Sequence, residues 1–258
     1  MRDNGLKKIA KSLYFRENAV RRIRFGPLRG MLYKVDDITG LAAWYSGNER
    51  GHQEAFKQLL MAGDVAIDIG ANWGVHTLYL SRLVGPSGLV LAFEPLPEAM
   101  WDLKWHLNAN KCFNVMTIQK AASEADGWAL FELGDSASTG ALAENPVASS
   151  QEKQLRIETT KVDTLIDRLT INRIKLIKID VEGAETKVLL GARKTIEQHR
   201  PYLLIDLHTP AQDVSVARLA LSWSYSLARL SAPQILHTDR GWPDLNGVWG
   251  TILASPLP

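Results

Sequence analysis

From Asp64 onward, short apolar runs alternate with helical segments, and this alternation constrains the fold more than any other feature of the chain. The predicted strands are VAIDI (65–69), LVLAFE (89–94), VMTIQKA (115–121), IKLIKID (174–180) and YLLIDL (202–207). The predicted helices between them are 76–84, 97–111 and 184–199. Continuous apolar strands connected through helices are typical of a parallel sheet. The sequence therefore predicts an α/β fold with a mainly parallel sheet.

Two segments depart from this rhythm. Within 127–162, WALFEL and LRIETTKV are predicted strands on either side of a long polar stretch, and two or three further strand candidates lie in the tail, 222–258. The first 62 residues are predicted to be a separate, largely helical extension, with helices over 5–24 and 49–61 and an extended piece at 30–37. We therefore expect two parts: an extension, 1–62, and a main domain, 63–258.

Charge and composition limit the partners and the cellular compartment that we expect for this chain. Residues 1–30 hold nine Lys or Arg and two acids, a net charge of +7, although the whole chain carries only +2. A basic amphipathic helix could contact an anionic membrane, and a solvated helix face is the simpler alternative. Cys112 is the one cysteine, so neither an intrachain disulfide nor a cysteine-cluster zinc site is possible. With no apolar run of ~18 residues, we expect a cytoplasmic protein.

The turn after the first predicted strand has the spacing D-x-G-x-x-x-G, formed by Asp68, Gly70 and Gly74 with Asn72 between the glycines. Dinucleotide-binding folds use G-x-G-x-x-G instead, which disfavours an NAD-dependent oxidoreductase. Glycines here permit a tight turn and a close backbone approach, and free N–H groups at the helix start attract a polar ligand. Ligands of open α/β sheets bind at this strand edge.

Two acids suggest the ligand. Asp68 could pair with an ammonium group, and Glu94, at the end of the next strand, could accept hydrogen bonds from ribose hydroxyls. A molecule with both a ribose and an amino-acid end is S-adenosylmethionine. The alternative is a strand–turn–helix whose glycines serve packing alone.

The chain resembles the FkbM family of S-adenosylmethionine-dependent methyltransferases over most of 64–208. The residues that carry the resemblance are DVAIDIGANWGVHTLYLSRL, VLAFEPLPEAMWDLKWHLNAN, AASEADGWALFEL and, most specifically, KIDVEGAETKVLLGA within 162–208. The resemblance implies a Rossmann-like, seven-stranded methyltransferase fold with an antiparallel last strand. It also implies methyl transfer, most often to a hydroxyl of a sugar or a secondary metabolite. IDLH at 205–208 departs from the family pattern, which leaves the roles of Asp206 and His208 open.

Carried over by position, the resemblance implies a set of cofactor-binding residues: Asp68, Gly70, Asn72, Gly74, Thr77, Glu94, Ala122 and Ser123. For Ser123 an ordinary turn serine is an equal alternative.

The catalytic candidates end the fourth and fifth predicted strands. Asp180 is expected to point into the ligand crevice, since strand-end carboxylates hold that position in α/β enzymes. His208 is the best candidate among the histidines for a general base, with Lys178 orienting the acceptor or stabilising its negative charge. Glu182 and Glu185 are explained as well by the helix dipole.

Alternatives remain open at this stage. Asp180, Glu182, Asp206 and His208 could hold a divalent metal, although acids near strand ends are common without one and no metal site is predicted. An RNA methyltransferase is supported only by the basic N-terminus, and the acidic remainder argues against nucleic acid. A non-catalytic binding module is the third reading. The sequence names neither the methyl acceptor, which is expected to be a small molecule or a glycan, nor the oligomeric state.

Overall fold

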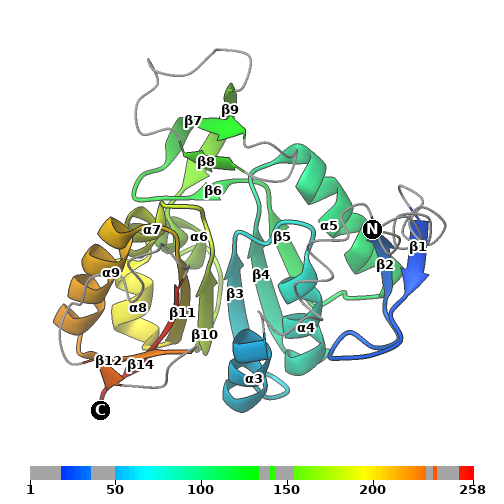
Figure 1. Cartoon of the computed structure of the whole chain (residues 1–258), viewed down its shortest axis with the longest axis horizontal. Helices are drawn as coiled ribbons and strands as arrows, with labels where there is room; N and C mark the ends of the chain where they lie inside the picture. The colour runs from blue at the N-terminus through cyan, green and yellow to red at the C-terminus, as the bar shows by residue number, and fades with distance from the viewer. Residues whose placement is uncertain (1–18, 36–49, 134–139, 143–153, 231–234, 237–249) are drawn as a thin grey trace, which may run out of the picture.

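The computed structural model describes residues 19–35, 50–133, 140–142, 154–230, 235–236 and 250–258 (Figure 1). Its centre is a sheet with strand order β13-β12-β14-β11-β10-β3-β4-β5. In that order the strands are Ile235–Leu236, Tyr225–Arg229, Gly250–Pro256, Tyr202–Leu207, Leu176–Ile179, Val65–Ile69, Leu89–Phe93 and Val115–Ile118. β11, β10, β3, β4 and β5 are parallel neighbours, whereas β14 runs antiparallel between β11 and β12. The predicted seven-stranded arrangement is confirmed, and β13 adds a short eighth strand.

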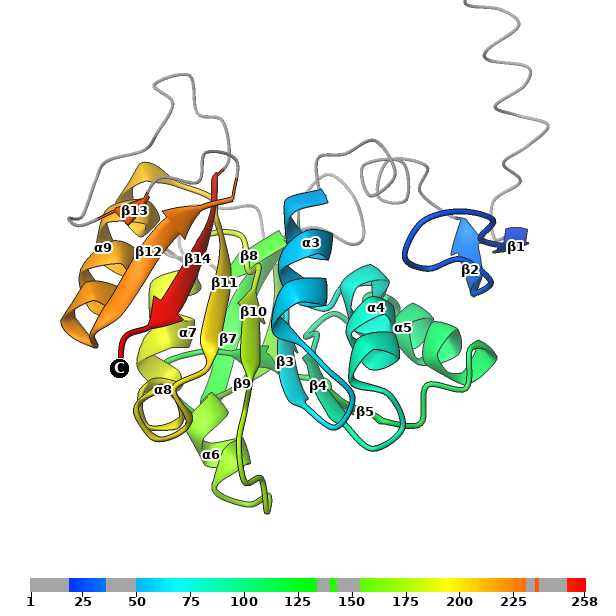
Figure 2. The same ribbon diagram turned by 90° about the horizontal axis from the view of Figure 1, so that it is seen from below.

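Helices cover both faces of this sheet (Figure 2). One face carries α3 (Arg50–Leu59), α4 (Val75–Val84) and α5 (Pro97–Ala109), and the other carries α6 (Val162–Ile166), α7 (Glu185–Gly191), α8 (Arg193–His199) and α9 (Pro210–Ser222). Alternation along β3 serves both faces, because Ala66 packs against the first helix group and Ile67 against the second. A strand buried on both sides must be apolar throughout, which explains the continuous runs in the sequence.

A second sheet stands over the carboxyl ends of the parallel strands (Figure 1). Its order is β6-β9-β7-β8, formed by Ala121–Ala122, Gln154–Thr160, Gly127–Leu133 and Gly140–Leu142. β7 and β9 are the two strands predicted within 127–162. The polar stretch between them lies mostly outside the described residues. This sheet brings Phe131 to the edge where α/β proteins bind ligands.

The extension is less helical than predicted. Ala19–Arg22, expected to end a helix, forms β1, which pairs antiparallel with β2 (Leu32–Val35). Arg21 opposite Tyr33 in this hairpin places successive residues on alternate faces, so the helical spacing of the apolar residues failed as a guide here. Residues 1–18 lie outside the described part of the chain. The second helix is confirmed as α3, and no described helix is long and apolar enough to cross a membrane.

The long helix predicted at 184–199 is broken in two at Ala192, which ends α7 and begins α8. Gly191, the last residue of α7, sits against the backbone of Ser123, just after β6. A Cβ at this position would lie 1.9 Å from the Ser123 carbonyl oxygen. Gly191 therefore fixes how closely the second sheet approaches the main domain.

We predict that Gly191→Ala destabilises the fold by about 2 kcal/mol or more, because the added methyl must displace backbone rather than a flexible side chain. Leu190→Ala, a change at the exposed neighbouring position, should cost less than about 1 kcal/mol. Urea unfolding of both variants measures the difference. Equal stabilities would mean that the junction between α7 and β6 is not tightly packed.

Candidate active site at the carboxyl edge of the sheet

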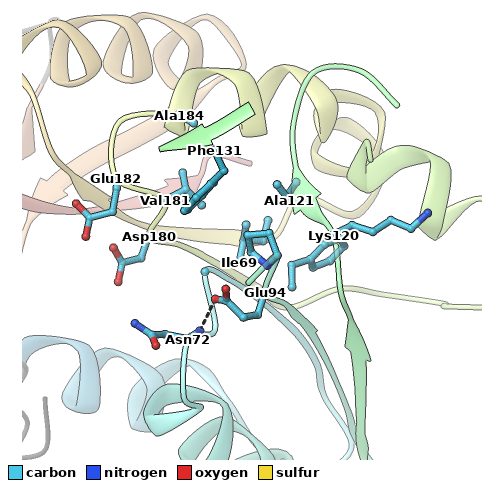
Figure 3. Close-up of a pocket in the computed structure, with 14 residues that line it drawn as sticks. Ile69, Asn72, Glu94, Lys120, Ala121, Phe131, Asp180, Val181, Glu182 and Ala184 are labelled. Carbon is cyan, nitrogen blue, oxygen red and sulfur yellow. Dashed lines mark hydrogen bonds between the residues drawn. The ribbon is translucent and has the colours of Figure 1, made fainter. Parts of the chain in front are cut away.

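A cavity opens where the second sheet faces the carboxyl ends of β3, β4 and β10 (Figure 3). Its empty space, including the open solvent at its mouth, is about 670 Å³. Gly70, Asn72 and Glu94 line one part, Asp180 and Glu182 another, and Phe131 reaches in from β7. The cavity thus joins several predicted cofactor residues to Asp180, whereas the other two predicted catalytic residues, Lys178 and His208, do not line it.

The glycine turn after β3 is built by two constraints. Gly70 has φ +78°, and a Cβ there would lie 1.8 Å from the carbonyl oxygen of Asp180. Only glycine permits both the left-handed backbone and this approach to the end of β10. The N–H groups of Gly70 and Ala71 donate to the carbonyl of Phe93 at 3.0 and 2.9 Å, so the turn is also bound to β4.

Glu94 is held by the same turn. Its carboxylate accepts hydrogen bonds from the N–H of Asn72 and the N–H of Leu96, both at 2.8 Å, one on each oxygen. Burial raises the pKa of Glu94 to about 7, although these two bonds and the nearby Lys178 favour the ionised form. Each oxygen keeps a further lone pair, and the carboxyl group borders the cavity. The two remaining lone pairs can accept hydrogen bonds from a pair of ribose hydroxyls.

Lys178 is buried beneath the cavity, 1% exposed. Its ammonium group donates to the carbonyl of Gly70 at 3.2 Å and lies 3.3 Å from Asp68 Oδ1 and 3.4 Å from Asp180 Oδ2. Asp68 is fully buried and also accepts from the Thr77 hydroxyl at 2.6 Å. The ammonium partner expected for Asp68 is therefore supplied, in this structure, by the chain itself.

His208 follows β11 and meets three carboxylates. Nδ1 lies 2.6 Å from Glu185 Oε1, and Nε2 lies 3.3 Å from Asp180 Oδ1 and 3.5 Å from Glu182 Oε2. Burial alone would lower the pKa of His208, but the bond to Glu185 and the charges of the other two acids outweigh it and raise the pKa to about 9. The pKa of Glu182 is also raised, in this case mainly because its carboxyl group is buried.

Asp206, whose role the sequence left open, has partners from two segments that lie far apart in the sequence, α3 and β14. Both of its oxygens lie 2.9 Å from His52 Nε2 of α3, and one accepts from the hydroxyl of Thr251 in β14. Burial alone would raise the pKa of Asp206, but His52 and Lys178 hold it well below the ordinary value. Asp206 thus ties α3 and β14 to the edge of the site.

Of the predicted cofactor residues, Gly70, Asn72, Glu94 and Ala122 line the cavity. The other four are buried around it or in the turn beside it: Asp68, Gly74, Thr77 and Ser123. Gly74 has φ +92°, and a Cβ there would lie 2.4 Å from Leu103, so its role in this structure is to let α4 pack on α5.

Sequence reasoning missed Phe131 and Lys120 as lining residues and His52 as a partner of the strand edge. Lys120 follows β5, but its amino group points away from Asp180 and Glu182 (Figure 3) and donates to Glu158. Phe131 belongs to WALFEL, where no local signal shows that the strand folds over the cavity.

The suggested metal set is only partly assembled. Ligand atoms of Asp180, Glu182 and His208 all lie within 4.8 Å of one another, whereas Asp206 is not part of this group and binds His52 and Thr251. One nitrogen of His208 already faces Glu185. The three acids around the ring also favour its protonated form.

Comparison with known proteins shows which protein family matches the part of the chain that forms this site. The model of the methyltransferase FkbM domain matches residues 68–227, more than half of the chain. The hexuronic acid methyltransferase AglP of Haloferax volcanii is 26% identical over 210 residues, which cover 76% of this chain and 82% of the relative. Methyltransferase 1 of Beauveria bassiana is 28% identical over 142 residues, but the match spans only 57% of that protein.

A solved structure agrees in fold. The methyltransferase FkbM from Methylobacillus flagellatus has a TM-score of 0.50 and 16% identity, with 84% of this chain and 55% of that chain covered. The match supports the Rossmann-like architecture, while the other chain is considerably longer than the shared part.

The raised pKa of Glu94 predicts a pH-dependent stability in the ligand-free protein. A carboxyl group whose pKa rises from 4.5 to about 7 on folding stabilises the fold fully below pH 4.5, and this contribution is lost as the pH rises through 7. Glu94→Gln, which stays neutral, should therefore gain stability over wild type by about 3 kcal/mol between pH 4.5 and pH 8. Urea unfolding at both pH values measures it. Glu98→Gln, an exposed acid four residues on, should follow wild type; a pH-independent difference for Glu94→Gln would contradict the prediction.

Proposed function

Because the chain belongs to the FkbM family of S-adenosylmethionine-dependent methyltransferases, we propose that it methylates a hydroxyl oxygen of a sugar, and that a hexuronic acid glycoside is the acceptor class. The observation that carries the proposal is the shared cavity, in which Glu94 and Asp180 face the same space. The name of the Haloferax volcanii relative supports the acceptor class. The relatives do not favour the nucleic-acid alternative.

On this proposal the cofactor-binding residues divide into two groups. Glu94 accepts hydrogen bonds from the ribose, while Gly70, Asn72 and Ala122 form walls of the cavity. Asp68, Thr77, Gly74 and Ser123 act from beneath, by holding the turn and the strand ends in place. S-adenosylmethionine supplies the electrophilic methyl carbon, and the protein supplies position and charge.

The acceptor side is formed by Asp180 and His208. A hydroxyl is a poor nucleophile until its proton leaves, and a base within hydrogen-bond reach contributes about 10²–10⁴-fold to the rate. In our proposal Asp180 binds the acceptor hydroxyl, and His208 Nε2 receives its proton when the ring is neutral, a form that the pKa of about 9 makes predominant only at alkaline pH. The acceptor oxygen then gains the methyl carbon as the carbon–sulfur bond breaks, and the electron pair of that bond stays on sulfur.

Lys178 contributes charge rather than contact. Its ammonium group is buried, and it reaches the acceptor site only through Asp180 Oδ2 at 3.4 Å. It fixes the orientation of that carboxylate, and its positive charge favours the developing alkoxide nearby. It is a positioning residue in this proposal.

The cofactor assignment predicts a loss of binding in Glu94→Ala. Calorimetric titration with S-adenosylmethionine should show micromolar binding to wild type and at least a tenfold weaker affinity for the variant, since two charge-assisted hydrogen bonds disappear. Glu98→Ala serves as the matched control and should bind like wild type. Equal affinity of all three proteins would remove Glu94 from the cofactor site.

The acceptor assignment predicts methyl transfer to hexuronic acid glycosides. With labelled S-adenosylmethionine, wild type should label these glycosides more than the matched neutral hexosides, and Asp180→Asn or His208→Asn should lower kcat by about 10²-fold or more with the cofactor KM unchanged. Asp167→Asn, an exposed acid on the far side of α6, is the control.

The product chemistry distinguishes the acceptor atom. A methyl ether on a hydroxyl survives mild alkali, whereas a methyl ester on the uronic carboxylate is hydrolysed. Alkali-labile label would overturn the hydroxyl assignment, and with it the need for a base, while leaving methyl transfer itself in place.

A further inference from the structure

Glu185 is, like Asp68, a fully buried acid beside the site, although its place in the first turn of α7 would be explained by the helix dipole alone. Its side chain is fully buried. A carboxylate that serves the helix dipole normally remains in water, because burying an ionised group is costly unless charged or hydrogen-bonding partners compensate. The position of Glu185 therefore calls for a second explanation.

Its partner is His208. Glu185 Oε1 lies 2.6 Å from His208 Nδ1, and it also accepts from the N–H of Gly183 at 2.9 Å. Glu185 Oε2 is buried and has no hydrogen-bond partner among the described residues. Since an ionised carboxylate only accepts hydrogen bonds, this contact requires the proton to be on Nδ1 of the histidine.

The consequence falls on the other ring nitrogen. With Nδ1 donating to Glu185, Nε2 is the atom that gains and loses the second proton. Nε2 lies beside Asp180 and Glu182, both of which line the cavity, whereas Glu185 does not line it. Glu185 and the two cavity-lining acids thus face different nitrogens of one imidazole ring, and Asp180 and Glu182 stand between His208 and the cavity.

Taking the proposed function as its basis, we propose that Glu185 is the positioning residue of His208: it fixes the tautomer in which Nε2 faces the acceptor, and it strengthens that nitrogen as a proton acceptor. During transfer the acceptor O–H bond breaks and its proton moves to Nε2. The resulting imidazolium then donates to Glu185 through Nδ1 and is flanked by Asp180 and Glu182 on its other side. Glu185 itself keeps its charge and never contacts the substrate.

The charged groups around His208 agree with these separate roles for Nδ1 and Nε2. The acids that face His208 come from the loop after β10 and from α7: Asp180, Glu182 and Glu185. Asp206 precedes His208 by two residues and is held by His52, and Lys178 lies on the far side of Asp180. Among these groups Glu185 alone makes a short contact with the ring, so its removal should have the largest effect.

The first test needs no acceptor. In ¹⁵N-labelled protein, the imidazole shifts of His208 should show a protonated Nδ1 and a titration centred near pH 9 in wild type. In Glu185→Gln the midpoint should fall by about 1–3 pH units, since a neighbouring charge is lost while the side-chain shape is kept. Glu197→Gln, an exposed acid on α8, is the control and should titrate like wild type. An unchanged midpoint or tautomer in Glu185→Gln would overturn the proposal.

The second test uses the hexuronic acid glycosides and separates positioning from mere stability. In Glu185→Gln the pH midpoint of the rising part of the kcat profile should fall by the same amount as the midpoint of the His208 titration. The plateau of kcat should be at least tenfold lower, and the KM for the cofactor should be unchanged. Glu185→Asp, which keeps the charge at a shorter reach, should recover part of the shift. A fall in kcat without any shift of this midpoint would make Glu185 a structural residue only.

The two proposals fail separately. If wild type labels no glycoside, the proposed function fails while the titration still decides the role of Glu185. Circular dichroism and urea unfolding of Glu185→Gln establish that it is folded. If that variant does not fold, Glu182→Gln at the exposed side of the ring provides the comparison, and it should lower the midpoint by less than one pH unit; a larger drop would mean that Glu182, rather than Glu185, controls the histidine.

Discussion

The buried ammonium group of Lys178 is the interaction on which the site depends. Asp68 and Asp180 end neighbouring strands, and without a cation between them their carboxylates would repel each other at the edge where the chain needs both. Lys178 lies between the two acids and also donates to the carbonyl of Gly70. One side chain therefore neutralises the strand ends and fixes the glycine turn against β10. Removing a single partner from such a buried set leaves an uncompensated charge, which typically costs about 3–5 kcal/mol.

That constraint couples the two halves of the cavity. The turn fixed by Lys178 presents the N–H of Asn72 to Glu94, while the same ammonium lies 3.4 Å from Asp180 Oδ2 at the other part of the cavity. The backbone contact between Gly70 and Asp180 leaves no room for slippage between β3 and β10. Methyl transfer is an in-line displacement that depends on the alignment of the reacting atoms, and rigid alignment of this kind contributes several kcal/mol to catalysis. The rigidity comes from the buried ammonium group of Lys178 and from the close backbone packing between Gly70 and Asp180.

The parts of this arrangement that were predictable are those with a local signal. The parallel strands follow from apolar runs that must be buried on both faces, and Gly70 and Glu94 follow from their spacing at strand ends. α9 was missed although Thr209 and Pro210 provide a cap and a favoured first residue, because the apolar spacing behind them is weak. β1 was predicted as helix because its four residues are too few to distinguish the two periods.

The other surprises have no local signal at all. Glu185 looks like a surface acid in a helix's first turn, and only the return of β11 beside β10 brings His208 onto it. His52 reaches Asp206 across 154 positions of sequence. These long-range pairs lie near the ends of β10 and β11, on the side that we propose for the acceptor, whereas most of the proposed cofactor residues come from one contiguous strand–turn–helix and the strand next to it. A family can therefore keep a readable cofactor motif while its acceptor side is set by contacts between distant segments. This difference explains why the sequence predicts methyl transfer but does not identify the acceptor.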